Sequence, residues 1–361
     1  MRVGGRRDCA GRQDVPLGVA IPGRSPLRAA PASLLVLAGI IAVQLGAGLA
    51  ARTFSQAGPA GMTGLRLWWA ALILAAIGGR ALGRTLRAII AARAWGDFAI
   101  AVTFGLVLAT MNFSIYQSFA RIPLGVAVTI EFLGPLAVAV ASSRRRLDLL
   151  WVVLAAAGVL LLTQGGVRLA GSGTAGPLLG LSTTAAGLAF ALVSAACWAA
   201  YILLSRATGR RFSGSAGLVI AMIVAALLVT GPAVAQAGPA LTRPGTIAEG
   251  LAVGLLSSVI PYRLELEVLR RVPAGVFGIW MSMEPAVAAL AGLVLLGQAL
   301  AARQWLAIVL VIIASAGAAR SPASHHQPRA GPSAGRPAGA PAELPDATPA
   351  ELRAELPPPA S

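Results

Sequence analysis

Apolar stretches of about 20 residues recur from residue 32 to residue 319, and they constrain the fold more than any other feature of this chain. A helix of ~20 apolar residues crosses the hydrocarbon core of a bilayer. Of the 361 residues, 57% are hydrophobic and only 12% are charged, whereas soluble domains average about 25% charged residues. Helices on the surface of a soluble protein would show polar faces. The pattern therefore predicts an all-α, polytopic membrane protein.

Ten transmembrane helices are predicted from these runs. Their approximate bounds are 32–51, 61–79, 97–119, 123–142, 148–166, 184–205, 215–235, 248–269, 274–297 and 303–319. The first run is also compatible with a cleaved signal sequence. We favour a retained helix, because the basic segment before it is long for a signal sequence and the helix count needs this run.

All 29 basic residues are arginine, and most of them lie between the apolar runs. With ten spans and a cytoplasmic N-terminus, 22 fall on the cytoplasmic side and five on the other, while Arg66 and Arg263 fall within spans. Cytoplasmic loops of membrane proteins are enriched in basic residues in this way. We therefore expect a multi-pass protein in a lipid bilayer with both termini in the cytoplasm. The net charge of +16 is explained by the arginines that set the orientation of the protein in the membrane. No nucleic-acid partner is expected.

Composition divides the chain into five parts. They are a disordered basic cytoplasmic arm (1–31), a first five-helix repeat (32–166), a linker (167–183), a second five-helix repeat (184–319) and a disordered Pro/Ala-rich tail (320–361).

Two segments of the chain are similar to each other, with a constant offset of 150 residues. "RIPLGVAVTIEFLGPLAVAV" (121–140) aligns without a gap with "RVPAGVFGIWMSMEPAVAAL" (271–290), and an arginine, two prolines, a glycine and a valine coincide. Each repeat would hold five spans. Because five is odd, the two copies must have opposite orientations in the membrane. Inverted repeats of this kind are typical of secondary transporters, whose substrate site lies near the midplane between the repeats.

Glu131 and Glu284 interrupt apolar runs near mid-membrane depth. A carboxylate at this depth costs several kcal/mol unless it is paired, hydrated or protonated, so it is a candidate functional group. Desolvation favours its protonated form, which suits proton coupling. The two glutamates are three positions apart in repeat coordinates and share a helix face. We expect them to bind a cationic amine, a proton or both. The alternative is a structural ion pair with Arg66 or Arg263.

Pro135 and Pro285 lie inside the same two helices. A proline lacks the N–H group that would bond to the carbonyl four residues earlier. The carbonyls freed in this way belong to Glu131 and Met281. We therefore predict a kink in each helix close to mid-span.

Other polar residues fall in or near the predicted spans. The further candidates for a substrate or proton site are Arg66, Asn112, Tyr262, Arg263, Glu265 and Glu267. Arg66 can either snorkel to the interface or bind a carboxylate. Arg263 and Glu267 are four residues apart and can form a local ion pair. For Asn112 and Tyr262, polar contacts between helices are the commoner role.

No catalytic arrangement appears in the sequence. Its two cysteines, Cys9 and Cys197, lie in an arm and in an apolar run, and its two histidines lie in the tail. No P-loop, dinucleotide fingerprint, metal-ligand cluster or nucleophile–base pair is found. We expect neither an enzyme nor a cofactor nor a metal site.

The chain resembles EamA-type drug/metabolite transporters, and most closely their threonine/homoserine exporter branch. The resemblance rests on residues 44–73, 121–162, 196–205 and 257–300. It implies ten helices in two inverted repeats, an inner-membrane location and export of small amino acids or related metabolites, driven by the proton gradient. Two departures are Arg263 after "IPY", where the family has a small polar residue, and Gln298, where "LGE" is usual.

Several alternatives stay open at this stage. A protein of the same class could move another metabolite or a drug, or could import its substrate. A protein of a different class, such as a membrane sensor or a lipid-handling protein, would need no proton-linked flux. A homodimer is also compatible with the sequence.

Overall fold

The computed structural model describes residues 30–141, 148–163, 182–212, 216–269 and 271–320, and within them it contains helices and no strand. The helices are α2 (Ala32–Arg52), α3 (Phe54–Ala92), α4 (Trp95–Phe119), α5 (Leu124–Glu131), α6 (Leu133–Ala141), α7 (Asp148–Thr163), α8 (Thr183–Arg211), α9 (Ala216–Ala237), η1 (Gly238–Thr242), α10 (Pro244–Gly254), η2 (Leu255–Val259), α11 (Ile260–Leu269), α12 (Ala274–Met281), α13 (Glu284–Leu296) and α14 (Ala302–Arg320). The predicted all-α, polytopic class is confirmed. Most of the predicted arm, linker and tail lies outside the described residues.

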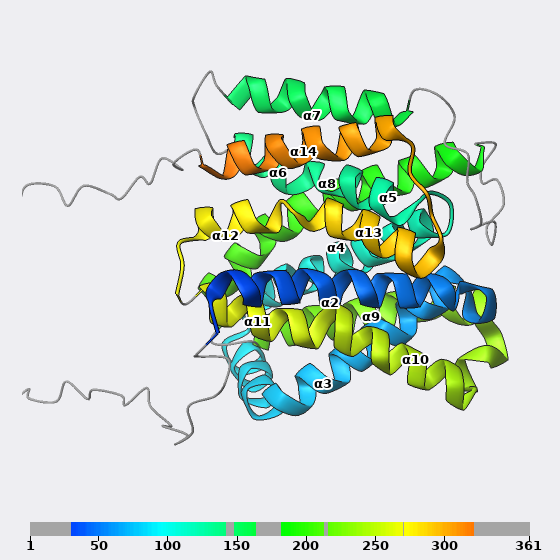
Figure 1. The fold of residues 1–361 in the computed structure, drawn as a ribbon. Helices are drawn as coiled ribbons and strands as arrows, with labels where there is room; N and C mark the ends of the chain where they lie inside the picture. The colour runs from blue at the N-terminus through cyan, green and yellow to red at the C-terminus, as the bar shows by residue number, and fades with distance from the viewer. Residues whose placement is uncertain (1–29, 142–147, 164–181, 213–215, 270, 321–361) are drawn as a thin grey trace, which may run out of the picture. The chain divides into compact units, whose positions relative to one another are not determined.

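Nine segments of the described chain are long and apolar enough to cross a membrane, by length and composition. The predicted span 148–166 corresponds to α7, a shorter helix of 16 residues. Large apolar side chains such as Val294 (78% exposed), Ile77 (70%) and Leu34 (57%) point outward. Soluble proteins rarely expose this much apolar surface, so these side chains indicate a lipid-facing exterior. The start of α2 and the end of α14 lie on the same side of the bundle (Figure 1).

Two of the membrane-spanning segments are broken in the middle. In the first, α5 ends at Glu131 and α6 begins at Leu133; in the second, α12 ends at Met281 and α13 begins at Glu284. The helices α5 and α12 correspond residue for residue at the 150-residue offset, and each follows a proline with nearly the same backbone angles (Pro123 φ −56°, ψ 141°; Pro273 φ −59°, ψ 146°). In each segment, a proline lies four residues after the last residue of the first helix. Because proline has no N–H group, the carbonyl of that last residue lacks its helical hydrogen bond, and the break follows it.

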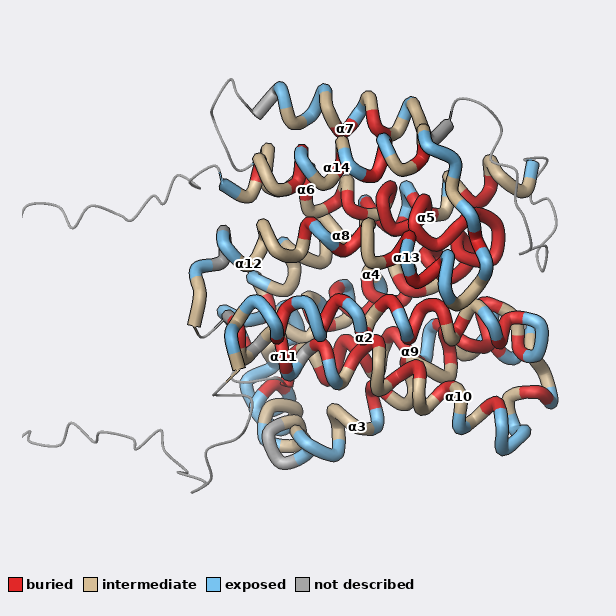
Figure 2. The backbone as a smooth tube through the Cα atoms, in the orientation of Figure 1, coloured by how far each residue is buried: buried red, intermediate tan, exposed pale blue. Residues whose placement is uncertain are grey.

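The two broken segments run in opposite directions (Figure 1), and α5 packs against α13. Gly125 of α5 allows this close approach, because a Cβ atom there would lie 2.6 Å from the Cα atom of Ala289. All residues of α5 up to Ile130 are buried, whereas α6 buries only Gly134 and Leu136. Figure 2 shows the same contrast between α5, which is mostly buried, and α12, which is not. One end of the bundle is therefore closed, and the other is more loosely packed.

The helix α3 continues beyond the second predicted span as far as Ala92. Its side chains Leu82, Leu86 and Ile89 pack with residues of α4 and α9, in a cluster that includes Ala101 and Ile220. This face of the helix therefore packs against protein.

Candidate functional site

A cavity of about 440 Å³ lies among α2, α3, α4, α8, α11, α14 and the two broken segments. This volume is in the usual range for small-molecule sites. Glu131, Glu284 and Glu265 all line it. At the loosely packed end, the lining continues to Ala139, on α6, and to Ala319, near the end of α14. The cavity thus extends from the helix breaks toward the side on which α14 ends.

Glu284 begins α13, directly after the break, and is 7% exposed. Its Oε1 accepts a hydrogen bond of 3.0 Å from the side-chain amide of Gln44, which lies in α2 and is 2% exposed. The other carboxylate oxygen, Oε2, and the amide oxygen of Gln44 are both buried and have no hydrogen-bond partner among the described residues. The break therefore presents two acceptor atoms without donors.

Glu131 ends α5 and is less buried than Glu284. Its Oε1 is 2.5 Å from the hydroxyl oxygen of Ser194 in α8, and that hydroxyl is also 3.1 Å from the carbonyl oxygen of Met111. Within the described chain, no ion pair forms between an arginine and either Glu131 or Glu284.

Arg66 of α3 also lines the cavity. Its Nη2 is 3.5 Å from the carbonyl oxygen of Ser257, and its guanidinium carbon is 5.4 Å from the ring centroid of Tyr116. Asn112 lines the same cavity and donates a 2.8 Å hydrogen bond to the carbonyl of Leu108 in its own helix.

The remaining candidates lie on α11, and only Glu265 lines the cavity. Ser257, Pro261 and Glu265 line it at intervals of four residues. Arg263 falls between these positions on the opposite side of the helix and is exposed, as the helical period dictates. The side chain of Tyr262 lies outside the described part of the structure.

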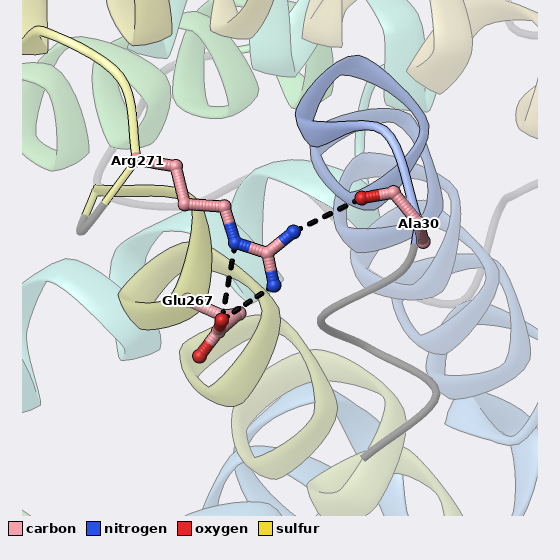
Figure 3. Close-up of polar contacts among 3 residues, drawn as sticks. All are labelled: Ala30, Glu267 and Arg271. Carbon is pink, nitrogen blue, oxygen red and sulfur yellow. Dashed lines mark hydrogen bonds and ion pairs between the residues drawn. The ribbon is translucent and has the colours of Figure 1, made fainter. Parts of the chain in front are cut away.

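Glu267 forms an ion pair with Arg271, four residues later in the chain (Figure 3). The Nε atom of Arg271 is 3.1 Å from Glu267 Oε1, and its Nη1 donates a 3.0 Å hydrogen bond to the carbonyl of Ala30. These contacts connect the region after α11 to the residues just before α2. They give Glu267 a structural environment that is distinct from the cavity.

Three site residues were missed in the sequence: Gln44 and Ser257, which line the cavity, and Ser194, which contacts Glu131. Gln44 carries a usable signal, because it is the only amide in its apolar run. Ser194 has no such signal, since small polar residues are common at helix contacts. Ser257 lies in the π-helical turn η2, and such turns are frequent at functional sites. In the described part of the chain, no group of three or more His, Cys, Asp or Glu residues could hold a metal ion.

Comparisons with known proteins match this architecture. The sequence profile of the EamA-like transporter family matches residues 185–320. The threonine/homoserine exporters RhtA of Salmonella typhimurium strain LT2 and of Escherichia coli strain K12 are each 38% identical over 284 residues, which is 79% of this chain and 90% of each relative. A solved structure described as "Crystal structure of protein" aligns with a TM-score of 0.51 at 18% identity, over 80% of this chain and 96% of that one. This last likeness concerns the fold alone.

The chain is therefore a multi-pass membrane transporter of a small molecule and is not an enzyme. It belongs to the EamA-like transporter family.

Proposed function

We propose that this protein exports small amino acids, of the threonine and homoserine type, across the bacterial inner membrane in exchange for protons. The substrate class is supported by the RhtA exporters, which are 38% identical over most of their length. The observation that carries the exchange mechanism is the pair Glu131 and Glu284. Both lie at helix breaks, both line one cavity, and each is held by a neutral side chain, Ser194 or Gln44.

A carboxylate that forms no ion pair with an arginine can bind either the ammonium group of an amino acid or a proton. The two ligands exclude each other on one carboxylate, because protonation removes the negative charge that attracts the ammonium. An amino acid that leaves Glu284 on the outer side is replaced by a proton, and the proton is released before the next amino acid binds inside. This competition links outward movement of substrate to inward movement of protons.

The contacts of Glu131 suit a group that changes its protonation state. A serine hydroxyl has one proton to donate. When Glu131 is ionised, Ser194 donates to it across the 2.5 Å contact. When Glu131 is protonated, it can donate to Ser194, and the serine hydroxyl can turn to the carbonyl of Met111 at 3.1 Å. Both charge states of Glu131 are thus provided with a hydrogen bond.

The distribution of arginines supports a cytoplasmic location for both chain ends. In that orientation, the cavity extends toward the cytoplasm along α14 and is closed on the outer side by the packing of α5 on α13. An export substrate enters from this side. Two inverted five-helix repeats would allow an outward-facing state to form if each repeat adopted the conformation that the other has in the inward-facing state.

Substrate counterflow tests the proposed function. The purified full chain is reconstituted into liposomes loaded with unlabelled L-threonine, and uptake of dilute labelled L-threonine is followed. We expect transient accumulation above equilibrium, because the loaded substrate drives exchange through the same cavity. A panel of other internal amino acids identifies which of them replace threonine.

The control liposomes contain no protein, and a second set holds the protein with no internal substrate. Neither should show the overshoot. Failure of every amino acid in the panel to drive counterflow would contradict the proposed function. Counterflow driven only by other metabolites would contradict the amino-acid assignment.

A further inference from the structure

The cavity contains two groups of buried polar atoms that lack partners, and the two groups differ in hydrogen-bonding character. At the break before α13, the unpartnered atoms Glu284 Oε2 and Gln44 Oε1 are hydrogen-bond acceptors. Elsewhere on the wall, Arg66 Nε, the hydroxyl of Tyr116 and the hydroxyl of Ser257 can donate and have no partner among the described residues. Buried polar groups are nearly always hydrogen-bonded, so both groups indicate a ligand.

The donor group is built from three separate elements. Arg66 comes from α3, Tyr116 from α4 and Ser257 from the π-helical turn η2. Tyr116 is 1% exposed, and its ring lies 5.4 Å from the Arg66 guanidinium. Among the described residues, Arg66 forms one hydrogen bond, which reaches the Ser257 carbonyl at 3.5 Å, a distance at which the bond is weak. The guanidinium is therefore positioned by its surroundings while its donors remain available for a ligand.

We infer that Arg66, with Tyr116 and Ser257, binds the carboxylate of the transported molecule, while Glu284 and Gln44 bind its ammonium group. A guanidinium matches a carboxylate by two parallel hydrogen bonds, and an ammonium group supplies the donors that the two acceptor atoms lack. The cavity therefore selects zwitterions. A free carboxylate is a requirement for tight binding, and an amine without one is bound poorly. This inference rests on the proposed function and specifies its substrate class.

The hydrogen-bonding needs of the cavity support the same assignment. Three carboxylates, Glu131, Glu265 and Glu284, line the cavity, and Arg66 is the one arginine among its described lining residues. An ammonium ion alone would satisfy the acceptor group and leave the guanidinium and the two hydroxyls without partners. A zwitterion satisfies both groups at once.

The test is a binding measurement on the purified full chain in lipid nanodiscs, with isothermal titration calorimetry. Three probes are used. L-Threonine carries both charges, L-threoninamide has a neutral amide in place of the carboxylate, and 3-hydroxybutyrate lacks the ammonium group. We expect the wild type to bind L-threonine at least about tenfold more tightly than either of the other probes, because each of these loses one charge-assisted contact.

Replacement of the guanidinium should remove the preference for a carboxylate. In Arg66→Met, the affinity for L-threonine should fall to about that for L-threoninamide, whose own affinity should stay within about threefold of wild type. Arg66→Lys, which keeps the charge and loses the planar fork, should be intermediate. Arg243→Met removes an exposed arginine just before α10 and should bind all three probes as the wild type does.

The possible failures are distinguishable. Equal affinity of the wild type for L-threonine and L-threoninamide would overturn the inference and leave the proposed function intact. Loss of L-threoninamide binding in both Arg66→Met and Arg66→Lys would make Arg66 a structural residue and would also overturn it. Failure of the wild type to bind any of the probes would contradict the proposed function itself.

Discussion

Glu284→Gln should reduce proton-gradient-driven flux of amino acid by about 10- to 100-fold, because a charge-assisted hydrogen bond contributes about 1.5–3 kcal/mol to binding and each 1.4 kcal/mol corresponds to tenfold. Glutamine has nearly the same shape and can keep the contact with Gln44, so the fold should be retained. It can neither carry the charge that attracts an ammonium group nor exchange a proton. Initial rates of labelled L-threonine uptake into proteoliposomes, with an imposed pH gradient, measure the effect.

Glu131→Gln should remove the pH dependence of transport by the same reasoning. The matched control is Glu249→Gln, which neutralises a carboxylate in α10 that does not line the cavity. Its transport should resemble that of the wild type. Full pH-dependent flux in both Glu131→Gln and Glu284→Gln would show that neither carboxylate carries protons or substrate.

Cysteine labelling should show opposite accessibility at the two ends of the bundle. The background is Cys9→Ser with Cys197→Ser, which removes both native thiols. In this background, Ala319→Cys lies where the cavity lining reaches the end of α14, and Ala299→Cys lies exposed beyond α13. With a membrane-impermeant maleimide, we expect Ala319→Cys to react in inverted membrane vesicles and to be protected in intact cells. Ala299→Cys should show the reverse pattern.

The labelling tests orientation independently of transport. Both sites lie in the described structure and neither is fully buried, so the labelled proteins should fold. Reaction of Ala319→Cys in intact cells would place the end of α14 outside and would contradict a cytoplasmic C-terminus. Reaction of both sites from the same side would contradict the orientation of α14 across the membrane.

The broken helices were largely predictable because their cause is local. A proline removes one backbone hydrogen bond wherever the chain is helical, so the positions of Pro135 and Pro285 indicate where the bonding is interrupted. The breaks after Glu131 and Met281 lie at those carbonyls. The predicted mid-membrane depth of the two glutamates rests in the same way on counting residues along each span.

The partners of the glutamates were not predictable, because they come from distant parts of the chain. Gln44 is 240 residues from Glu284, and Ser194 is 63 residues from Glu131. Such contacts depend on which helices become neighbours. A sequence pattern on one helix carries no information on that choice.

On α11, the spacing of charged residues did not determine which arginine pairs with Glu267. Glu267 has an arginine four residues before it and another four residues after it, and both spacings allow an ion pair. In the structure it contacts Arg271. The π-helical turn η2 shifts the helical register just before α11. The register between α10 and α11 therefore could not be derived from an ideal helical period.

Proton movement coupled to substrate movement tests the central claim most directly, namely that one cavity exchanges amino acid for protons. Proteoliposomes with equal pH on both sides enclose a pH-sensitive dye, and L-threonine is added outside. Inward movement of threonine should drive protons out, so the lumen should become more alkaline with the wild type. The double variant that carries both Glu131→Gln and Glu284→Gln should cause no change in lumen pH. Uptake of threonine without a change in lumen pH, or with acidification, would contradict proton exchange.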